Sequence, residues 1–284
     1  MSAPGRIFVS GGHEFKRGGG NDALSDHIVD LADSSHPRIC LLPTASGDPE
    51  DQIASFRRTF GERDCLPSAV SLFRLATERV DLREHLLAQD AIYVGGGSMV
   101  NLIAIWAAHG VGEQLRECLE EGVLVCGQSA GAMCWFEQGV TCSSGAPTAV
   151  AGLGLLEGSA CVHYHGEPER RHFYLQAVAE GGLKHGIGLD DQTAALFEDG
   201  QMVETVSARP TASVWRVAHT EDESADGMTA IEDRLDSRCL VHQAPAADAL
   251  GADILELRET LAARAATGRS RRTGVGRTGV GRLD

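Results

Sequence analysis

The stretch Val123-Leu-Val-Cys-Gly-Gln-Ser-Ala-Gly131 decides the fold class of this chain. Its apolar half, 123–126, predicts a buried strand, and a helical stretch, 132–136, follows the glycines. Between them stands a Gly-x-Ser-x-Gly pattern, which in this setting forms a sharp turn that exposes its serine. The pattern alone is weak, since Gly and Ser are common. Its context favours Ser129 as a nucleophile over a simple tight turn.

Strand-like and helical segments alternate outward from this turn. Strands are predicted at 6–10, 38–42, 70–75 and 91–94, and helices at 22–32, 49–60, 81–88, 99–108 and 112–121. This order predicts an α/β fold with a mostly parallel, doubly wound sheet flanked by helices. Beyond residue 183, short strand-like runs predict an antiparallel C-terminal extension, at 187–189, 194–197, 202–206, 213–217 and 239–241, and a closing helix is predicted at 247–266.

Four glycine-rich or polar loops follow predicted strands. They are Gly11-Gly12, Thr44–Asp48, Gly95–Gly97 and Gly127–Gly131. Ligands of such sheets bind at the carboxyl ends of the strands. The four loops are therefore expected to converge on one site.

Length and charge narrow the class of protein. The 284 residues suit a single α/β domain, expected over 1–267, followed by an Arg/Gly-rich tail, 268–284. We expect this tail to be disordered, although its arginines would also suit an electrostatic docking arm. The whole chain carries a formal charge of −15, which repels phosphate backbones and argues against a nucleic-acid partner.

Membrane and redox signals point to the cytoplasm. No stretch reaches the ~18 apolar residues that a membrane span needs, and the N-terminus lacks the apolar region of a signal peptide. The eight cysteines contain no Cys-x-x-Cys pair. Without a secretion signal they indicate reduced, mostly buried thiols in a cytosolic protein.

A serine nucleophile needs a base, and His163 is the best candidate. It follows an apolar run, 158–162, and therefore lies near a strand end. With His165 it could instead ligate zinc, but no further ligands at zinc spacing accompany the pair. Backbone amides of Gly96 or Gly97, together with Ala130, would form an oxyanion hole, or the glycines make only a tight turn.

The chain resembles the dipeptidase E / cyanophycinase family of serine peptidases over roughly residues 6–220. The motifs that carry the resemblance are Leu42-Pro-Thr-Ala-Ser46, Tyr93-Val-Gly-Gly-Gly97, Gly127-Gln-Ser-Ala-Gly-Ala132, Val162-His-Tyr164 with Glu167-Pro-Glu-Arg-Arg171, and Gly186-Ile-Gly-Leu-Asp-Asp191. The resemblance implies a class I glutamine-amidotransferase-like, flavodoxin-like fold. It also implies Ser129 as nucleophile, His163 as base, and no metal or organic cofactor. The substrates implied are short or isoaspartyl-like peptides, often with an acidic N-terminal residue.

Three departures from the family pattern leave the acid of the triad open. Ser98 replaces an Asn, the segment Thr141-Cys142-Ser143 lacks an acid, and His165 replaces an Asp. Glu137, on the predicted helix of Ser129, is our candidate to orient the base. Glu157 and Asp190 are alternatives.

Arg170 and Arg171 follow the histidine segment. A guanidinium facing the pocket would bind a substrate carboxylate bidentately, but a solvated helix start is an equally good interpretation. The sequence thus predicts a cytoplasmic serine-type dipeptidase acting on a small peptide, and leaves a homodimer open. A non-catalytic binding protein, and an α/β-hydrolase-type esterase using His219 or His242, are the alternatives.

Overall fold

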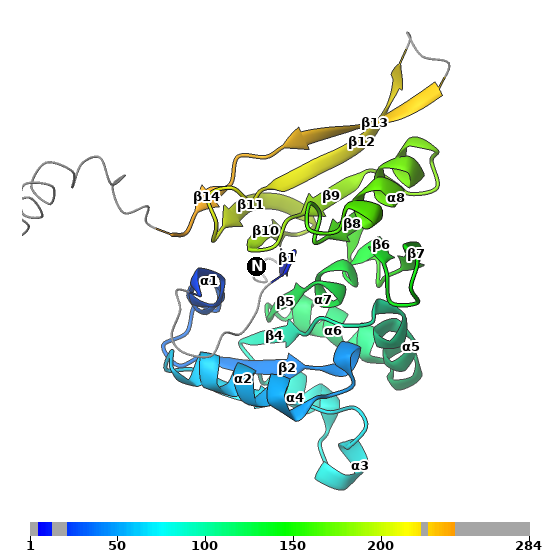
Figure 1. Cartoon of the computed structure of the whole chain (residues 1–284). Coiled ribbons are helices and arrows are strands. Elements are labelled where there is room, and N and C mark those ends of the chain that lie inside the picture. The colour runs from blue at the N-terminus through cyan, green and yellow to red at the C-terminus, as the bar shows by residue number, and fades with distance from the viewer. Residues whose placement is uncertain (1–4, 13–21, 223–226, 242–284) are drawn as a thin grey trace, which may run out of the picture. The chain divides into compact units, whose positions relative to one another are not determined.

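The first half of the described chain alternates strands with helices, whereas the second half consists mainly of strands (Figure 1). The computed structural model describes residues 5–12, 22–222 and 227–241. The first half contains β1 (Arg6–Ser10), α1 (Ala23–Leu31), β2 (Arg38–Leu42), the 3-10 turn η1 (Thr44–Ser46), α2 (Glu50–Gly61), β3 (Leu66–Ala69), α3 (Leu75–Glu78), α4 (Leu82–Leu87), β4 (Ala91–Val94), α5 (Met99–His109), α6 (Val111–Glu120), β5 (Leu124–Gln128) and α7 (Ala130–Met133). The second half contains β6 (Phe136–Thr141), β7 (Thr148–Ala151), β8 (Leu156–Val162), α8 (Pro168–Ala179), β9 (Gly186–Leu189), β10 (Thr193–Glu198), β11 (Gln201–Ser207), β12 (Val214–Asp222), β13 (Gly227–Arg234) and β14 (Arg238–Cys239).

Eight of these strands form one sheet, in the order β14-β11-β10-β1-β5-β4-β2-β3. The five strands from β1 to β3 in this order pair in parallel. Strands β10 and β11 extend the sheet beyond β1 in antiparallel pairing. Parallel pairing brings the carboxyl ends of β1, β2, β4 and β5 to one edge, which is where the predicted site loops lie.

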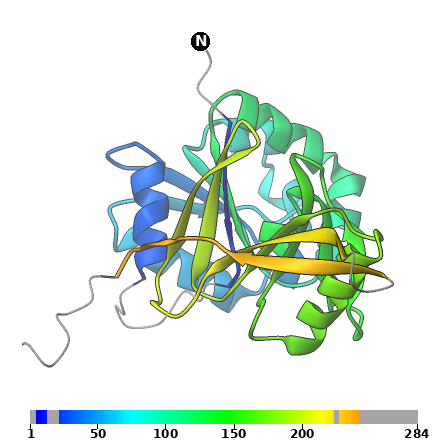
Figure 2. The ribbon, with the colours of Figure 1, turned by 90° about the horizontal axis from the view of Figure 1, so that it is seen from above.

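Side chains of the parallel strands alternate between two cores. Ile92 and Val94 of β4 pack in one core, with buried residues of α4, α5 and α6. Ala91 and Tyr93 pack in the other core, with buried residues of α1 and α2. Figure 2 shows α1 and α6 on opposite sides of β1. Helices on both faces bury both sides of the parallel array, so central strands such as β2 and β4 are nearly continuous apolar runs rather than alternately polar.

Helix α5 illustrates how local sequence sets the boundaries. Its N-cap is Ser98, whose hydroxyl accepts a hydrogen bond from the amide of Asn101 at 3.2 Å. The helix ends at Gly110, which has a left-handed φ of 62° that favours glycine. Both signals are present in the sequence, and the helix predicted at 99–108 is confirmed.

A second sheet, of six strands, was not predicted. Its order is β13-β12-β9-β8-β6-β7, with β6, β8 and β9 in parallel. The sequence interpretation placed a helix over 132–136, but α7 ends at Met133 and β6 begins at Phe136. The expected antiparallel extension is therefore divided between two sheets. Strands β10 and β11 extend the first sheet in antiparallel pairing, whereas β9, which pairs in parallel with β8, and β12 belong to the second.

The strand predicted at 70–75 is wrong. The chain forms β3 at Leu66–Ala69 instead, and α3 begins at Leu75. Val70 and Leu72 are nearly inaccessible and belong to the core, although they lie outside any strand. Their apolar side chains thus indicate burial rather than strand pairing. A short apolar run does not by itself distinguish the two.

Several expectations concern residues outside the described ranges. These are the closing helix predicted at 247–266, the domain limit at 267 and the tail, 268–284. Among the described residues, no helix is long and apolar enough to cross a membrane. All eight cysteines are free, and six of them are buried, which agrees with the expected reduced thiols.

Candidate active site

Ser129 lies on a strained turn between β5 and α7. Its backbone angles are φ 52° and ψ −118°, a conformation that non-glycine residues seldom adopt. The turn is possible because Gly127 and Gly131 lack side chains. A Cβ at Gly127 would overlap the carbonyl of Gly131, and a Cβ at Gly131 would overlap the carbonyl of Val94. These two glycines therefore allow the sharp bend that presents the serine.

The hydroxyl of Ser129 meets the ring of His163, 34 positions later in the chain. Ser129 Oγ lies 2.9 Å from His163 Nε2, a hydrogen-bond distance. His163 directly follows β8 and also has a positive φ, of 53°. The two side chains come from different sheets, since β5 belongs to the eight-stranded sheet and β8 to the six-stranded one. The site is thus assembled where the ends of the two sheets meet.

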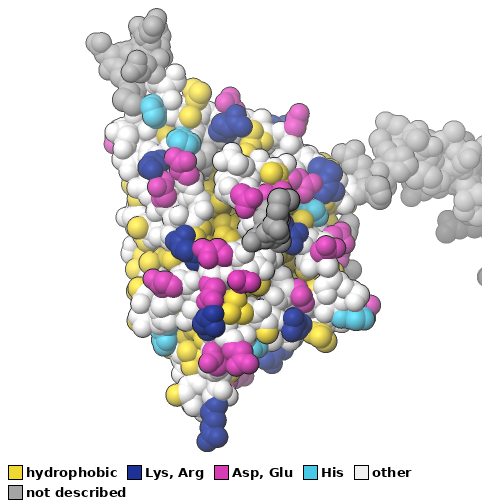
Figure 3. All heavy atoms as spheres, turned by 180° about the vertical axis from the view of Figure 1, so that it is seen from behind, with side chains coloured by type: hydrophobic (Ala, Val, Ile, Leu, Met, Phe, Trp, Pro, Cys, Tyr) yellow, Lys and Arg dark blue, Asp and Glu magenta, His cyan; other side chains and the backbone are white. Residues whose placement is uncertain are grey.

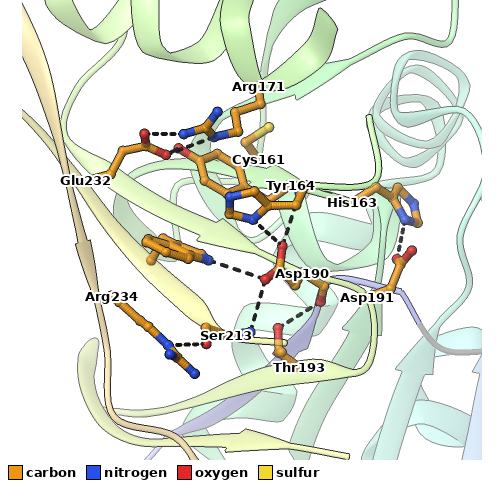
Figure 4. A network of polar contacts seen from close by, with 12 residues as sticks. Cys161, His163, Tyr164, Arg171, Asp190, Asp191, Thr193, Ser213, Glu232 and Arg234 are labelled. Carbon is orange, nitrogen blue, oxygen red and sulfur yellow. Dashed lines mark hydrogen bonds and ion pairs between the residues drawn. The ribbon is translucent and has the colours of Figure 1, made fainter. Parts of the chain in front are cut away.

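Asp191 lies behind the imidazole of His163. Its Oδ1 is 2.6 Å from His163 Nδ1 (Figure 4). A carboxylate only accepts hydrogen bonds, so Nδ1 carries the proton and Nε2 remains an acceptor for the serine hydroxyl. This hydrogen bond lowers the pKa of the Asp191 carboxyl below its ordinary value, against the opposing effect of burial. Asp191 is therefore held ionised where it can stabilise a charged imidazole.

Glu137 does not reach His163, and its proposed role as the acid was wrong. Its carboxylate accepts hydrogen bonds from the Gly158 amide and from Lys184 Nζ, both at 2.8 Å. Gly158 lies near the start of β8, whereas His163 follows its end. Five residues of extended chain separate the two positions by roughly 16 Å.

The two alternative acids also lie elsewhere. Glu157 is exposed on β8, and the Asp190 carboxylate is bonded to His165 rather than to His163. Asp191 ends the motif Gly186–Asp191, which carries part of the family resemblance, but the sequence alone assigned it no role. Its position directly after a strand, beside a second acidic residue, was the available signal.

The four predicted loops do converge. A Cβ added to Gly12, after β1, would overlap Asp191 Oδ1. A Cβ added to Gly96 would lie 3.2 Å from the Cβ of Ser129. Gly97 has a φ of 144° and packs on the backbone of Ala45, which belongs to the loop Thr44–Asp48. Glycine at these positions lets backbone approach the reactive side chains closely.

Arg170 and Arg171 take different positions. Arg170 is buried, pairs with Glu167 at 3.0 Å, and lines a surface pocket of about 540 Å³ that also includes Gly166. Arg171 pairs with Glu232 of β13 and lies over the ring of Tyr164. Both arginines therefore have partners within the chain, and Arg170, which also donates through Nη1 to the Val162 carbonyl at 3.3 Å, lies beside the segment that contains His163.

The three departures from the family pattern have separate explanations. Ser98 caps α5. Cys142 Sγ accepts a hydrogen bond from Arg170 Nε at 3.4 Å. His165 is bonded through Nδ1 to Asp190 at 2.8 Å.

His163 and His165 thus bond to different carboxylates, whereas a zinc site would bring both imidazoles to one metal ion. Within the described ranges, no group of three or more metal-ligating side chains is found.

Serine, histidine and aspartate in this order form a chain of two hydrogen bonds. Such a chain lets the imidazole take the hydroxyl proton during attack on a carbonyl carbon, while the carboxylate stabilises the resulting imidazolium. The chemistry available to this site is therefore nucleophilic acyl transfer.

Comparison with known proteins places the chain in a family. Residues 7–205 match the model of peptidase family S51. The chain is 42% identical over 221 residues to the uncharacterized peptidase YgaJ of Bacillus subtilis (strain 168), covering 78% of this chain and 95% of that protein. It is 26% identical over 212 residues to a protein of Geminocystis herdmanii (strain PCC 6308) named cyanophycinase, covering 70% of this chain and 76% of that one.

Two solved structures share the fold. A peptidase from an acI-B1 Actinobacterium aligns with a TM-score of 0.59, covering 82% of this chain and 95% of that one. A putative peptidase E protein from Listeria monocytogenes EGD-e aligns with a TM-score of 0.51, covering 72% and 99%. Both are 17% identical to this chain, so the likeness concerns the fold alone.

Proposed function

The chain belongs to peptidase family S51, and on this premise we propose that it is a serine-type exopeptidase that hydrolyses short peptides. The observation that carries the proposal is the continuous hydrogen-bonded line from Ser129 Oγ through the ring of His163 to Asp191. Each side chain in this line has the chemistry that its position requires. The fold itself contributes little to the argument, because one scaffold hosts many reactions.

The proposed reaction has two stages. Ser129 Oγ attacks the scissile carbonyl carbon while His163 Nε2 takes the hydroxyl proton, and His163 then gives that proton to the leaving amine. Water, deprotonated by the same nitrogen, attacks the acyl-enzyme, and collapse of the second intermediate releases the acid product and restores Ser129. Asp191 holds the ring in the required tautomer throughout.

Backbone amides beside Ser129 are proposed to stabilise the oxyanion. Gly96 lies against the serine, and Gly97 is next to it in the same loop. Ala130 follows the serine at the start of α7. Amides of these residues would donate to the negative charge that develops on the substrate oxygen.

The substrate class rests on the family resemblance and on one pocket. We propose dipeptide-like substrates with an acidic N-terminal residue or an isoaspartyl-like bond. Arg170 is the better candidate of the two arginines to contact a substrate carboxylate, since it lines the pocket beside Gly166. The Glu167 ion pair would compete with that carboxylate, so the preference is expected to be moderate.

Two alternatives from the sequence remain testable. A binding protein without catalysis would keep the fold but fail to react at Ser129. An esterase of the α/β-hydrolase type would need a different base. His219 lies on β12, whereas His163 already contacts the serine, and His242 lies outside the described residues.

Further expectations accompany the proposal. We keep the class I glutamine-amidotransferase-like fold as our interpretation, supported by a parallel five-strand array with helices on both faces. A cytoplasmic location is proposed, supported by the free cysteines. No metal or organic cofactor is expected, so activity should survive a chelator. A homodimer stays open.

The acidic composition also argues against nucleic acid as a partner. On the face of the molecule seen in Figure 3, Lys and Arg side chains are interspersed with Asp and Glu rather than gathered into one patch.

The test is a peptide screen with a matched variant. Purified protein and Ser129→Ala would be assayed on Asp-X, Glu-X and isoaspartyl dipeptides, alongside neutral dipeptides and a short-chain ester. We expect wild type to hydrolyse at least one peptide group and Ser129→Ala to be inactive on it. Equal turnover by both proteins would refute the proposal, and hydrolysis of the ester alone would favour the esterase.

A further inference from the structure

A second histidine–aspartate pair lies next to the first. His165 Nδ1 donates to Asp190 Oδ1 at 2.8 Å, while His163 Nδ1 donates to Asp191 Oδ1 at 2.6 Å. Both histidines follow β8, and both aspartates follow β9. The two strands pair in parallel, with Val162 opposite Leu189, so their carboxyl ends meet. The same two loops are therefore tied together twice.

Asp190 is the centre of the second tie. Its carboxylate accepts four hydrogen bonds, from the amide and Nδ1 of His165 and from the amide of Ser213 and Nε1 of Trp215 (Figure 4). Its side chain is 12% exposed. A buried carboxylate is costly unless its oxygens are hydrogen-bonded, and here both oxygens have two donors each.

The backbone of Asp190 is fixed as well. Its amide donates to the carbonyl of Ser213 at 3.2 Å. Its carbonyl accepts from the amide of Thr193 at 3.2 Å and from the Thr193 hydroxyl at 2.8 Å. Asp190 thus joins the loop after β8, the turn after β9 and the start of β12 (Figure 4). These contacts of Asp190, which together we call the anchor, also fix the backbone at the next residue, Asp191.

The anchor also acts on His163. That residue has a positive φ of 53°, a conformation that is uncommon for residues other than glycine. The surrounding bonds run from the Tyr164 amide to the Leu189 carbonyl at 3.1 Å, from the His165 amide to Asp190 at 3.1 Å, and from the Glu167 amide to the His163 carbonyl at 2.8 Å. One of these three bonds ends on the Asp190 side chain.

We propose that Asp190 and His165 are positioning residues, which hold His163 and Asp191 at the geometry that the hydrolysis requires. This proposal rests on the proposed function, because it assigns the pair a purpose in that reaction. Among the described residues, the Ser129 hydroxyl is hydrogen-bonded to His163 and not to Asp190 or His165, so both would act through the catalytic pair. Displacement of a catalytic group by about 1 Å costs up to about 100-fold in rate, which is the scale expected here.

The first test uses Asp190→Asn, which is nearly isosteric. The amide nitrogen of the new asparagine is itself a donor, and it would face two of the four groups that now donate to Asp190. These groups would repel it, so the loops after β8 and β9 would shift apart. We expect kcat to fall roughly 10- to 100-fold. The KM is expected to change less than kcat, since neither Asp190 nor His165 is among the proposed substrate contacts. Trp215→Phe, which removes one donor and keeps an aromatic ring beside His165, is expected to lose less.

The second test keeps the proposal decidable if Asp190→Asn does not fold. His165→Ala removes two ring contacts and a donor, whereas His165→Asn keeps a side-chain nitrogen near the place of Nδ1. The His165 side chain is 45% exposed, so both variants should fold. We expect kcat to fall about 10-fold in His165→Ala and to return close to wild type in His165→Asn.

A spectroscopic readout separates positioning from overall stability. The Nδ1 proton of His163, held against Asp191, should give a downfield proton NMR signal that Asp191→Asn abolishes. We expect this signal to shift or broaden in Asp190→Asn, or in His165→Ala if the former does not fold, at temperatures well below unfolding. The signal reports the geometry even if wild type proves inactive on every peptide, so failure of the proposed function is distinguished. Unchanged kcat and an unchanged signal in the folded variants would overturn the positioning role.

Discussion

The two histidine–aspartate pairs differ most in their carboxylates. The Asp191 side chain is 44% exposed and, among the described residues, has one hydrogen bond, from His163. The Asp190 side chain is 12% exposed and accepts four. A carboxylate with a single donor can respond when its histidine gains a charge, whereas one held by four donors cannot move. The His163–Asp191 pair is therefore suited to proton transfer, and the His165–Asp190 pair is suited to holding the loops in place.

Removal of the base should have the largest effect. We expect His163→Ala to lower kcat/KM by about 10⁴-fold or more, because no other described histidine bonds to the serine hydroxyl. The measurement is steady-state hydrolysis of the best dipeptide from the screen. His165→Asn, from the adjacent pair, is the matched control and should stay near wild type. Similar losses in both variants would erase the distinction between the pairs.

Removal of the acid should come next. We expect Asp191→Asn to lower kcat by about 10³- to 10⁴-fold, since an amide can hold the ring in the wrong tautomer. Glu137→Gln is the control, because Glu137 is bonded to Gly158 and Lys184 instead. That variant should keep kcat within about twofold. A larger loss in Glu137→Gln than in Asp191→Asn would return the acid role to Glu137.

A side chain that crowds the His163–Asp191 pair should have an intermediate effect on kcat. A Cβ at Gly12 would overlap Asp191 Oδ1 and lie 2.9 Å from His163 Cε1. We expect Gly12→Ala to lower kcat by roughly 10- to 100-fold through this displacement. Gly61→Ala, where nothing lies within 4 Å of the added Cβ, serves as control. Equal rates for Gly12→Ala and wild type would show that the pair tolerates movement.

The smallest effect concerns stability and pH. The His163 hydrogen bond lowers the pKa of Asp191 in the folded state, so it stabilises the fold where Asp191 is ionised. The free energy of unfolding of wild type minus that of Asp191→Asn should be constant above about pH 5 and decline as pH falls below about 4. Because the Asp191 side chain is 44% exposed, solvent screens its interaction with His163, and the contribution to the free energy of unfolding should not exceed about 1 kcal/mol. Urea unfolding at several pH values would measure it, and a decline only on raising the pH would contradict it.

Ser129 and His163 could be proposed as nucleophile and base from the sequence because each stands directly after an apolar, strand-like run. A glycine-flanked serine after an apolar strand requires few neighbours to be recognised, and both glycines prove to lack room for a Cβ. The helices beside the parallel strands were equally visible, since caps such as Ser98 and Gly110 are local. The helix caps depend on contacts within a few residues of each other, whereas the close packing of Gly131 involves the Val94 carbonyl of a neighbouring strand.

The proposed acid, Asp191, could not be found in this way because its contact with His163 depends on strand pairing. His163 and Asp191 are 28 positions apart and meet only through the β8–β9 register. Glu137 is closer to the serine in sequence, but it lies beside the start of β8 rather than its end. The second sheet itself was missed for the same reason. Its parallel strands β6, β8 and β9 are joined by pairings that no short pattern reveals.

Activation of Ser129 by His163 is the step on which the proposed hydrolysis depends most. A fluorophosphonate probe, followed by peptide mapping with mass spectrometry, tests this without knowledge of the substrate. We predict a covalent adduct on Ser129 in the wild-type protein and at least about 100-fold slower labelling in His163→Ala. Wild-type protein that stays unmodified at Ser129, or a variant labelled as fast as wild type, would contradict it.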